Sequence, residues 1–529
     1  MEKRLIIAIA FSVLIIVAFQ YLGPKPAPIS TVAIPSVDTR EVAITKEMKE
    51  PPVIIEPAVD EKTLTVETDR LILTFSNIGG SIKEIRLKDY KDLKTGEPFV
   101  LAEIQNPASY IFAMSGVAPK VAFDKISYDV VTKDDAIIYS ATAGELAVVK
   151  KYIIHKYNYN IELQLSIKNT SGKVKDVCYR VIAGSGIVEK TEQDKALIET
   201  SSKINEMPVK FKRAKPGETI VNPGIVNWTA LKSKYFSLIL KPLDKTRNEF
   251  YTQSGPGAIV TGVESEFLSI PPSTAIDSKF VLFAGPNHIP ILKEAGYDFE
   301  ETINYGFFGG ISKALLSILR MLHNVVRSWG VAIILLSIFL NVITLPLTMK
   351  SFKSMQKMQE LHPQMEKLKL ENKNNPQKLN KEVMELYKKY KINPLSGCLP
   401  MVLQMPIFVA LYQALTKALE LRSASFLWIK DLSSPDAVAL PFTLPILGSS
   451  INILPLVMVG AMVLQQKIST KSMGGAVTEE QKQQQKMMLI IMPIMFGFIF
   501  YNMPSGLVLY WVVNTALTIV EQGAILKKA

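Results

Sequence analysis

The stretch Gly330–Lys350, GVAIILLSIFLNVITLPLTMK, constrains this chain most. It is long enough to cross the roughly 30 Å hydrocarbon core of a bilayer as a helix. Ser337 is followed by Asn341, Thr344 and Thr348 at offsets of four, seven and eleven residues. At about 100° per residue these side chains share one narrow face of the helix. Such a face predicts either a neighbouring helix that accepts hydrogen bonds or a space that holds water, and this stretch leaves both readings open.

The composition places much of the chain in a membrane, since its 529 residues are 48% hydrophobic and carry a formal net charge of +12. Leu5–Leu22 is a first apolar segment of spanning length. We interpret it as an uncleaved anchor rather than a signal peptide, because it is long and no small-x-small cleavage site follows. Further spans are expected at about Leu399–Leu419, around Ile453–Leu464, at Met487–Tyr501 and at Gly506–Ile525. The sequence therefore predicts an α-helical membrane protein with six transmembrane helices, five of which form a core.

The distribution of lysine orients these spans, because cytoplasmic loops carry an excess of Lys and Arg. Lys350–Lys391 contains eleven lysines and five glutamates, and the tail ends in Lys527-Lys528. Both are therefore expected in the cytoplasm, together with both termini, and the large region before Gly330 outside it. The expected domains are a membrane anchor (1–22), a Pro-rich linker (23–57), a periplasmic β-sandwich (58–300), an amphipathic interfacial helix (301–328), transmembrane helix 2 (329–349), a cytoplasmic helical hairpin (350–394), and transmembrane helices 3–6 (395–526) with a cytoplasmic loop (467–486).

The outer region has the pattern of an antiparallel β protein. Ile161–Lys168 alternates apolar and polar residues without a break, which is typical of a strand with one wet face. Turn signals such as Asn77–Gly80, Ser171-Gly172 and Pro256-Gly257 separate the expected strands. The other strands are expected at Leu71–Phe75, Ala136–Tyr139, Phe236–Leu240 and Lys279–Phe283. An all-β sandwich follows, and no pairing of carboxylates or histidines in it predicts catalysis or a metal site.

Two further helical regions flank the first core span. Apolar residues from Phe308 to Val325 recur every three or four positions between Lys and Arg, which predicts a helix lying flat in the outer membrane interface. Lys350–Lys391 predicts a helical hairpin, in which Pro363 kinks the first helix and Asn374-Asn375-Pro376 separates it from the second. Leu379, Val383, Leu386 and Tyr390 are expected on the buried face of that second helix.

The last span carries a polar face like that of the first core span. Trp511, Asn514, Thr515, Thr518 and Gln522 lie on one side of the helix expected at Gly506–Ile525. The span at 399–419 adds Gln404 and Tyr412 on loosely the same side, whereas Gln413 points away. Two such helices and a partial third can face each other around a wet cavity, and no chain of intramembrane acids or histidines suggests a proton-coupled pump.

Three segments resemble the core helices of the YidC/Oxa/Alb family of membrane protein insertases. They are GVAIILLSIFLNVITLPLT, INPLSGCLPMVLQMPIF and MPSGLVLYWVVNTALTIVEQ. The order of anchor, outer domain, flat helix, lysine-rich hairpin and further spans resembles the form of Gram-negative bacteria. The resemblance implies a hydrophilic groove open to the cytoplasm and to lipid but closed toward the outside. In the family, the position of Asn341 most often holds arginine, and that of Trp511 often holds tyrosine.

Combined with the polar faces, the resemblance predicts a substrate groove and no catalytic, cofactor or metal site. Lys388, Lys389 and Lys391 are expected to contact clients or the ribosome. The groove residues are expected to be Ser337, Asn341, Thr344, Gln404, Tyr510, Trp511, Asn514 and Thr518.

The predicted function is that of a non-enzymatic insertase and chaperone of the bacterial inner membrane, working without nucleotide hydrolysis. Nascent membrane proteins, the Sec translocon, the ribosome, the signal recognition pathway and the lipid bilayer are the expected partners, with no sequence-specific nucleic acid. Two alternatives are a small-molecule transporter, for which we find no internal repeat between the core spans, and a membrane-tethered periplasmic binding domain, which needs no polar faces in its spans.

Overall fold

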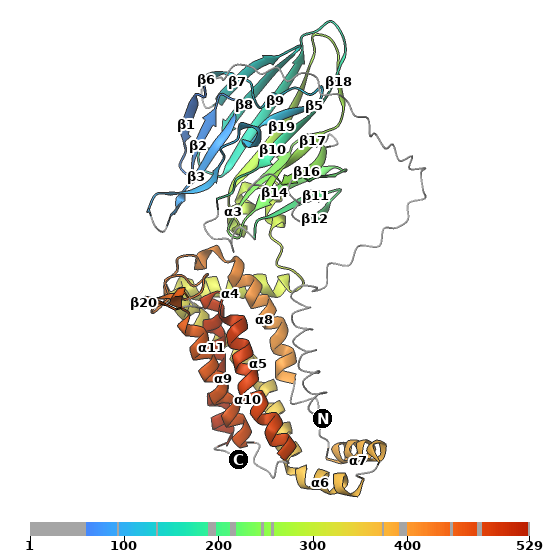
Figure 1. Ribbon diagram of the computed structural model, residues 1–529, viewed down its shortest axis with the longest axis vertical. Coiled ribbons are helices and arrows are strands. Elements are labelled where there is room, and N and C mark those ends of the chain that lie inside the picture. The colour runs from blue at the N-terminus through green and yellow to red at the C-terminus, as the bar shows by residue number, and fades with distance from the viewer. Residues whose placement is uncertain are drawn as a thin grey trace. The chain divides into compact units, whose positions relative to one another are not determined.

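The computed structural model of the protein describes residues 60–526, apart from 93–94, 134–135, 189–196, 212–217, 245–247, 255–258, 373–374, 391–398, 445–447 and 473–478 (Figure 1). The predicted anchor and linker therefore lie outside the described residues, as do Lys391 and the turn at Pro256-Gly257. Two parts of the chain follow in sequence, an antiparallel β domain and a helical region.

The β domain consists of three antiparallel sheets. The four-stranded sheet is β1 (Thr63–Glu67), β2 (Leu71–Ser76), β3 (Ser81–Lys91) and β4 (Pro98–Glu103). The six-stranded sheet is β13 (Thr219–Asn222), β16 (Asn248–Ser254), β17 (Ile259–Ser265), β10 (Lys175–Gly184) and β18 (Leu268–Ile270), with β5 (Met114–Ala118) beside β10. The nine-stranded sheet is β12 (Met207–Phe211), β11 (Glu199–Ile204), β14 (Val226–Lys232), β15 (Phe236–Pro242), β19 (Ala275–Pro286), β9 (Asn160–Asn169), β8 (Leu146–Ile154), β7 (Ala136–Ala143) and β6 (Asp129–Lys133).

The alternation in the sequence explains why these strands pack as they do. In β9 the side chains of Ile161, Leu163, Leu165 and Ile167 are buried, and the residues between them are partly exposed, as predicted. Strands of the six- and nine-stranded sheets contact each other through β14 and β17 and through β10 and β15. One hydrophobic core contains residues of all three sheets. The predicted β-sandwich is therefore confirmed as an architecture of packed antiparallel sheets.

The helical region begins after a short helix, α3 (Ile289–Ala295), and a 3₁₀ turn, η2 (Phe299–Thr302), that follow the last long strand. Its helices are α4 (Gly309–Val326), α5 (Trp329–Glu360), α6 (His362–Glu371), α7 (Pro376–Lys389), α8 (Leu399–Lys417), α9 (Ile453–Ser472), α10 (Glu479–Phe500) and α11 (Ser505–Leu526). Helix α11 contacts α5, α8 and α9, and α10 contacts α9 (Figure 1). By length and hydropathy, Trp329–Ser354 and Ser505–Ala524 are each long and apolar enough to cross a membrane.

Three features differ from the sequence prediction. Helix α5 continues past the expected membrane span to Glu360. Pro363 does not kink a helix but lies in the first turn of α6, where the backbone N–H that proline lacks would have no partner within the helix. In α7 the buried aromatic side chain is Tyr387, because the predicted Tyr390 follows the end of the helix and is exposed. A small hairpin of β20 (Val438–Leu444) and β21 (Gly448–Ile451), which the sequence did not suggest, lies between α8 and α9. The predicted break before α7 is confirmed, since the Asn375 side chain caps that helix.

Candidate functional site

Burial in the helical bundle is asymmetric. We call the end where α5 meets α4 the α4 end, and the end near α6 and α7 the hairpin end. Among the described side chains of α5 and α8–α11, every buried aliphatic or aromatic residue lies in the half toward the α4 end. These residues are Ala332, Ile333, Leu336, Ala410, Leu411, Ala414, Leu415, Leu454, Met458, Phe500, Leu507, Val508, Leu509 and Tyr510. The α4 end is therefore closed by a packed apolar core.

From the middle of the bundle to the hairpin end, the buried side chains are polar. Asn341, Ser351, Thr515 and Gln522 are buried there, whereas the described aliphatic and aromatic residues of the same turns are partly or fully exposed. Burial of a polar side chain in a dry core is unfavourable unless hydrogen bonds within the protein replace those that it loses with water. This half of the bundle therefore buries polar groups where the other half buries apolar ones.

The hydroxyl groups of the predicted polar faces bond to their own helices. Ser337 Oγ donates to the Ile333 carbonyl at 2.8 Å, and Thr344 Oγ1 donates to the Leu340 carbonyl at 3.1 Å. Thr518 Oγ1 in α11 likewise donates to the Asn514 carbonyl at 2.8 Å. Such bonds to the preceding turn satisfy a hydroxyl without a second helix. These three hydroxyls therefore do not join the helices to each other, whereas Gln522 of α11 accepts a hydrogen bond from Ser469 Oγ of α9 at 3.0 Å.

Asn341 is the most informative residue of the face. It is only 9% exposed, yet its side-chain amide makes no hydrogen bond to any other described residue. Its neighbour Val342, about 100° further around α5, is 60% exposed. Asn514 on α11 is half-buried, and its amide also lacks a partner among the described residues. Both amides are therefore free to bond to water.

Gln404 and Tyr510 form a hydrogen bond between α8 and α11. Gln404 Nε2 donates to Tyr510 Oη at 2.7 Å, and Tyr510 is 1% exposed. Trp511 beside it lies in an aromatic cluster with Phe408 and Phe500, each with its ring centroid 5.1 Å from the Trp511 ring, and with Phe496 at 5.6 Å. Trp511 thus contacts three aromatic rings from α8 and α10 that the sequence did not single out.

Other predicted side chains lie elsewhere. Tyr412 is exposed and does not join Gln404, whereas Gln413 lies next to Gly306, in the segment before α4. Lys388 and Lys389 are exposed in the last turn of α7, and Lys391 is outside the described residues. Within the described part of the chain, no group of three His, Cys, Asp or Glu residues could hold a metal ion.

The Gln404–Tyr510 pair gives an asymmetric prediction. Gln404→Leu should lower the stability of the bundle by about 1–3 kcal/mol, because it leaves the buried Tyr510 hydroxyl without its donor. Tyr510→Phe should lower it by less, since the half-exposed Gln404 amide can turn to water. Thermal unfolding of the purified protein in detergent measures both. The double variant should be closer to the native protein than Gln404→Leu, and equal losses in the two single variants would contradict this account.

These elements define a class of protein, a helical bundle with apolar helices of membrane-spanning length joined to an antiparallel β domain. The family model described as 60Kd inner membrane protein matches residues 321–529, and the model described as YidC periplasmic domain matches residues 63–318. The membrane protein insertase YidC of Geotalea daltonii is 31% identical to this chain, with 100% of this chain and 99% of the relative covered. That of Citrifermentans bemidjiense is 32% identical, with 99% and 98% covered. A solved structure described as an active YidC insertase with its first transmembrane domain resolved is 20% identical, with 88% and 92% covered and a TM-score of 0.37.

The chain belongs to the YidC family of membrane protein insertases. The resemblance seen in the core helices is thus confirmed over the full length of the relatives, and the β domain corresponds to the periplasmic domain of the family.

Proposed function

We propose that this protein inserts and chaperones nascent membrane proteins, moving them from the cytoplasm into the inner membrane through a hydrophilic groove. The groove is lined by Ser337, Asn341, Thr344, Gln404, Tyr510, Trp511, Asn514 and Thr518. The observation that carries the proposal is the asymmetric burial of the bundle, which is apolar and packed at the α4 end but polar toward the hairpin end. Such a bundle admits a polar segment from one side only, which disfavours a transporter with access from both sides.

Simple energetics explain how the groove acts without nucleotide hydrolysis. A charged side chain at the bilayer centre costs about 2.5–3.5 kcal/mol on insertion scales. Each unpaired buried polar group costs roughly 1–3 kcal/mol more. A groove that offers water and amides over half of the bilayer shortens the dry path of a polar tail. The apolar segment of the client then moves sideways into lipid, which releases about 25 cal/mol per Å² of apolar surface.

The proposed topology has six spans with both termini in the cytoplasm and the β domain in the periplasm. The lysines of the hairpin support it, because cytoplasmic loops carry an excess of Lys and Arg, and Lys388 and Lys389 are exposed in the last turn of α7. The Sec translocon, the ribosome and the signal recognition pathway are proposed partners on the basis of family membership.

Photocrosslinking tests the proposal directly. A photoreactive amino acid at position 341 should crosslink to a ribosome-stalled nascent membrane protein, because Asn341 faces the groove. The matched control places the same group at Val342, one residue away and exposed toward lipid. Crosslinking from position 341 well above that from position 342 is expected. Equal crosslinking from both positions, or none from 341 while the client still inserts, would overturn the groove.

Cysteine labelling checks the topology. The labelling site in the β domain is Thr132, in the exposed edge strand β6. In a protein with Cys178→Ser and Cys398→Ser, a membrane-impermeant maleimide added to spheroplasts should label Thr132→Cys. It should label Gln377→Cys, exposed in α7, only after the membrane is opened. The reverse pattern would contradict the orientation.

The hairpin lysines should increase the rate at which clients are captured. Ribosomal RNA and the acidic tails of nascent chains carry negative charge, and oppositely charged patches raise association rates by about tenfold or more. Replacing Lys388, Lys389 and Lys391 with glutamate should therefore reduce client crosslinking by about tenfold at low salt and by less at high salt. The control reverses the same number of charges at Lys367, Lys378 and Lys381, earlier in the hairpin. A similar loss in both triple variants would show that net charge alone is responsible.

A further inference from the structure

We propose that Glu420 is a positioning residue that holds α4 across the closed end of the groove and so seals this end against the periplasm. The proposal rests on the proposed function and adds a residue outside the groove to it. Glu420 belongs to the 3₁₀ turn η4 (Leu419–Leu421), which directly follows α8.

One carboxylate oxygen of Glu420 meets two basic side chains from distant parts of the chain. Arg320 Nε of α4 donates to Glu420 Oε1 at 2.6 Å, and His288 Nε2, at the end of the β domain, lies 3.2 Å from the same oxygen. The Glu420 side chain is only 17% exposed. Burial alone would raise the pKa of Glu420, but the hydrogen bond from His288 and the charge of Arg320 hold the pKa at about 2. The carboxylate is therefore charged and paired at every physiological pH.

The residues next to Glu420 fix it in place. Leu419 is buried in the core of the β domain, whereas Leu421 is buried in the core of the helical bundle. The Arg422 guanidinium lies over the rings of Phe99 and Phe236, at 4.7 Å and 5.2 Å from their centroids, which is within the range of cation–π attraction. The four residues Leu419–Arg422 therefore join both cores, and Glu420 projects from this rigid segment toward α4.

Helix α4 closes the α4 end by lying against α5 and α8. Its Leu315, Leu316 and Leu319 are buried in the same core as the helices of the bundle. Ser312 Oγ donates to the Ala410 carbonyl of α8 at 2.9 Å, in a buried position. The other face of α4, which carries Met321 and Val325, is exposed. One apolar stripe and two polar contacts thus hold α4 on the bundle.

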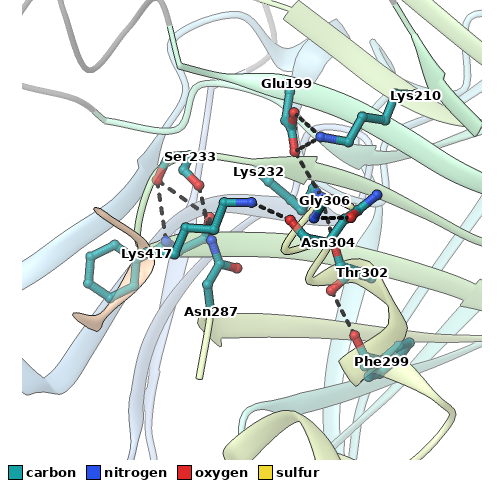
Figure 2. Close-up of polar contacts among 11 residues, drawn as sticks. Glu199, Lys210, Lys232, Ser233, Asn287, Phe299, Thr302, Asn304, Gly306 and Lys417 are labelled. Atoms are coloured by element: carbon teal, nitrogen blue, oxygen red, sulfur yellow. Dashed lines mark hydrogen bonds and ion pairs between the residues drawn. The ribbon is translucent and has the colours of Figure 1, made fainter. Parts of the chain in front are cut away.

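The segment that leads into α4 is fastened separately (Figure 2). Lys232 Nζ, buried in the β domain and paired with Glu199, donates to the Thr302 carbonyl at 2.8 Å. Lys417, in the last turn of α8, donates to the Asn304 carbonyl. Both contacts act before residue 309, where α4 begins. In the second half of α4, the Arg320–Glu420 pair is the polar anchor beside the buried Leu319 and the stacking of His323 on Trp329 at 3.8 Å. Loss of the pair therefore loosens this half, while the contacts of the first half remain.

A labelling experiment separates a seal from a merely structural contact. Ser337 is fully buried beneath the α4 end. In the background with Cys178→Ser and Cys398→Ser, Ser337→Cys should react slowly with an impermeant maleimide added from the periplasmic side. Adding Glu420→Gln should raise the rate of labelling at least several-fold, while the thermal unfolding temperature of the full-length protein in detergent stays close to that of the parent. Asp298→Asn, at an exposed carboxylate near the end of the β domain, is the control and should leave the rate unchanged.

A second variant, at the other residue of the ion pair, distinguishes loss of the seal from misfolding of Glu420→Gln. Arg320→Gln should reproduce the effect, and the double variant Glu420→Gln with Arg320→Gln should label no faster than either single variant, because both changes break one contact. An unchanged labelling rate in both single variants, or additive effects in the double variant, would overturn the seal. Crosslinking from position 341 in the same proteins reports the groove independently. If it persists while labelling is unchanged, the seal is wrong and the proposed function stands; if it is absent even in the parent, the proposed function itself fails.

Discussion

Replacing Asn341 with leucine should slow the insertion of membrane proteins by about tenfold. The amide of Asn341 is nearly buried and has no hydrogen-bond partner among the described residues, so in the proposed groove it is paired with water or client. Leucine removes a donor pair and an acceptor from the middle of the bundle. One polar group of the client then stays unpaired as the client passes position 341, which raises the free-energy barrier to insertion by about 1–3 kcal/mol. This increase corresponds to roughly a five- to 150-fold lower rate. In vitro insertion into vesicles containing the purified variant measures the effect.

Two further substitutions at this position separate hydration from packing. Asn341→Arg should be tolerated and should speed clients with acidic tails, because a cation attracts them most strongly where water is scarce. Asn341→Gln should retain most of the activity. If Asn341 only held two helices together, its contact would be worth about 0.6 kcal/mol, and Asn341→Leu would insert clients almost normally. That outcome, or a failure of Asn341→Arg to fold, would contradict the role of Asn341 in a wet groove.

The strands and the polar faces of the helices were predictable from the sequence because each depends on local periodicity. The alternation of apolar and polar residues in Ile161–Lys168 predicts which side chains of β9 are buried, and this prediction needs no information on distant residues. The same holds for the offsets from Ser337 to Thr348, since a helix of fixed pitch places them on one face. The break before α7 follows from Asn375 and Pro376, whose preferences for the helix start are intrinsic.

Features that depend on long-range packing were not predictable. Pro363 could either kink a helix or begin one, and only the end of α5 at Glu360 decides between them. The contact of Gln404 with Tyr510, and of Trp511 with the rings of α8 and α10, depends on how three helices meet. A single carboxylate between two basic residues that lie 100 and 132 positions away, as at Glu420, has no signature in the local sequence. Tyr510 was singled out only through the resemblance to the family.

The β domain contains a buried lysine that should make its stability depend strongly on pH. Lys150 in β8 is 0% exposed, and its ammonium group donates to the carbonyls of Gly79 at 2.7 Å and Phe112 at 2.8 Å. Burial lowers the pKa of Lys150 to about 7, although the negative charge of Asp124 raises it in part. In the unfolded chain the pKa is about 10.4. Between these values the unfolded chain binds more protons than the folded domain, so stability rises with pH, by at most about 1.4 kcal/mol per pH unit.

From pH 7 to pH 9 the free energy of unfolding of the β domain should therefore rise by about 2 kcal/mol. Urea denaturation of a fragment spanning residues 60–296 measures it, with Trp228, which is buried in the core, as the fluorescent reporter. The measurement is made with Cys178→Ser, because burial raises the pKa of that thiol and its titration would add an opposite slope. Lys150→Met should remove most of the rise, although it leaves the buried Phe112 carbonyl without a donor, whereas the Gly79 carbonyl still accepts from Ser81 Oγ at 2.9 Å. A rise of the same size in Lys150→Met would assign the slope to another group, such as Lys232, whose pKa burial also lowers. A flat profile in the parent would mean that the carbonyls of Gly79 and Phe112 keep Lys150 charged despite its burial.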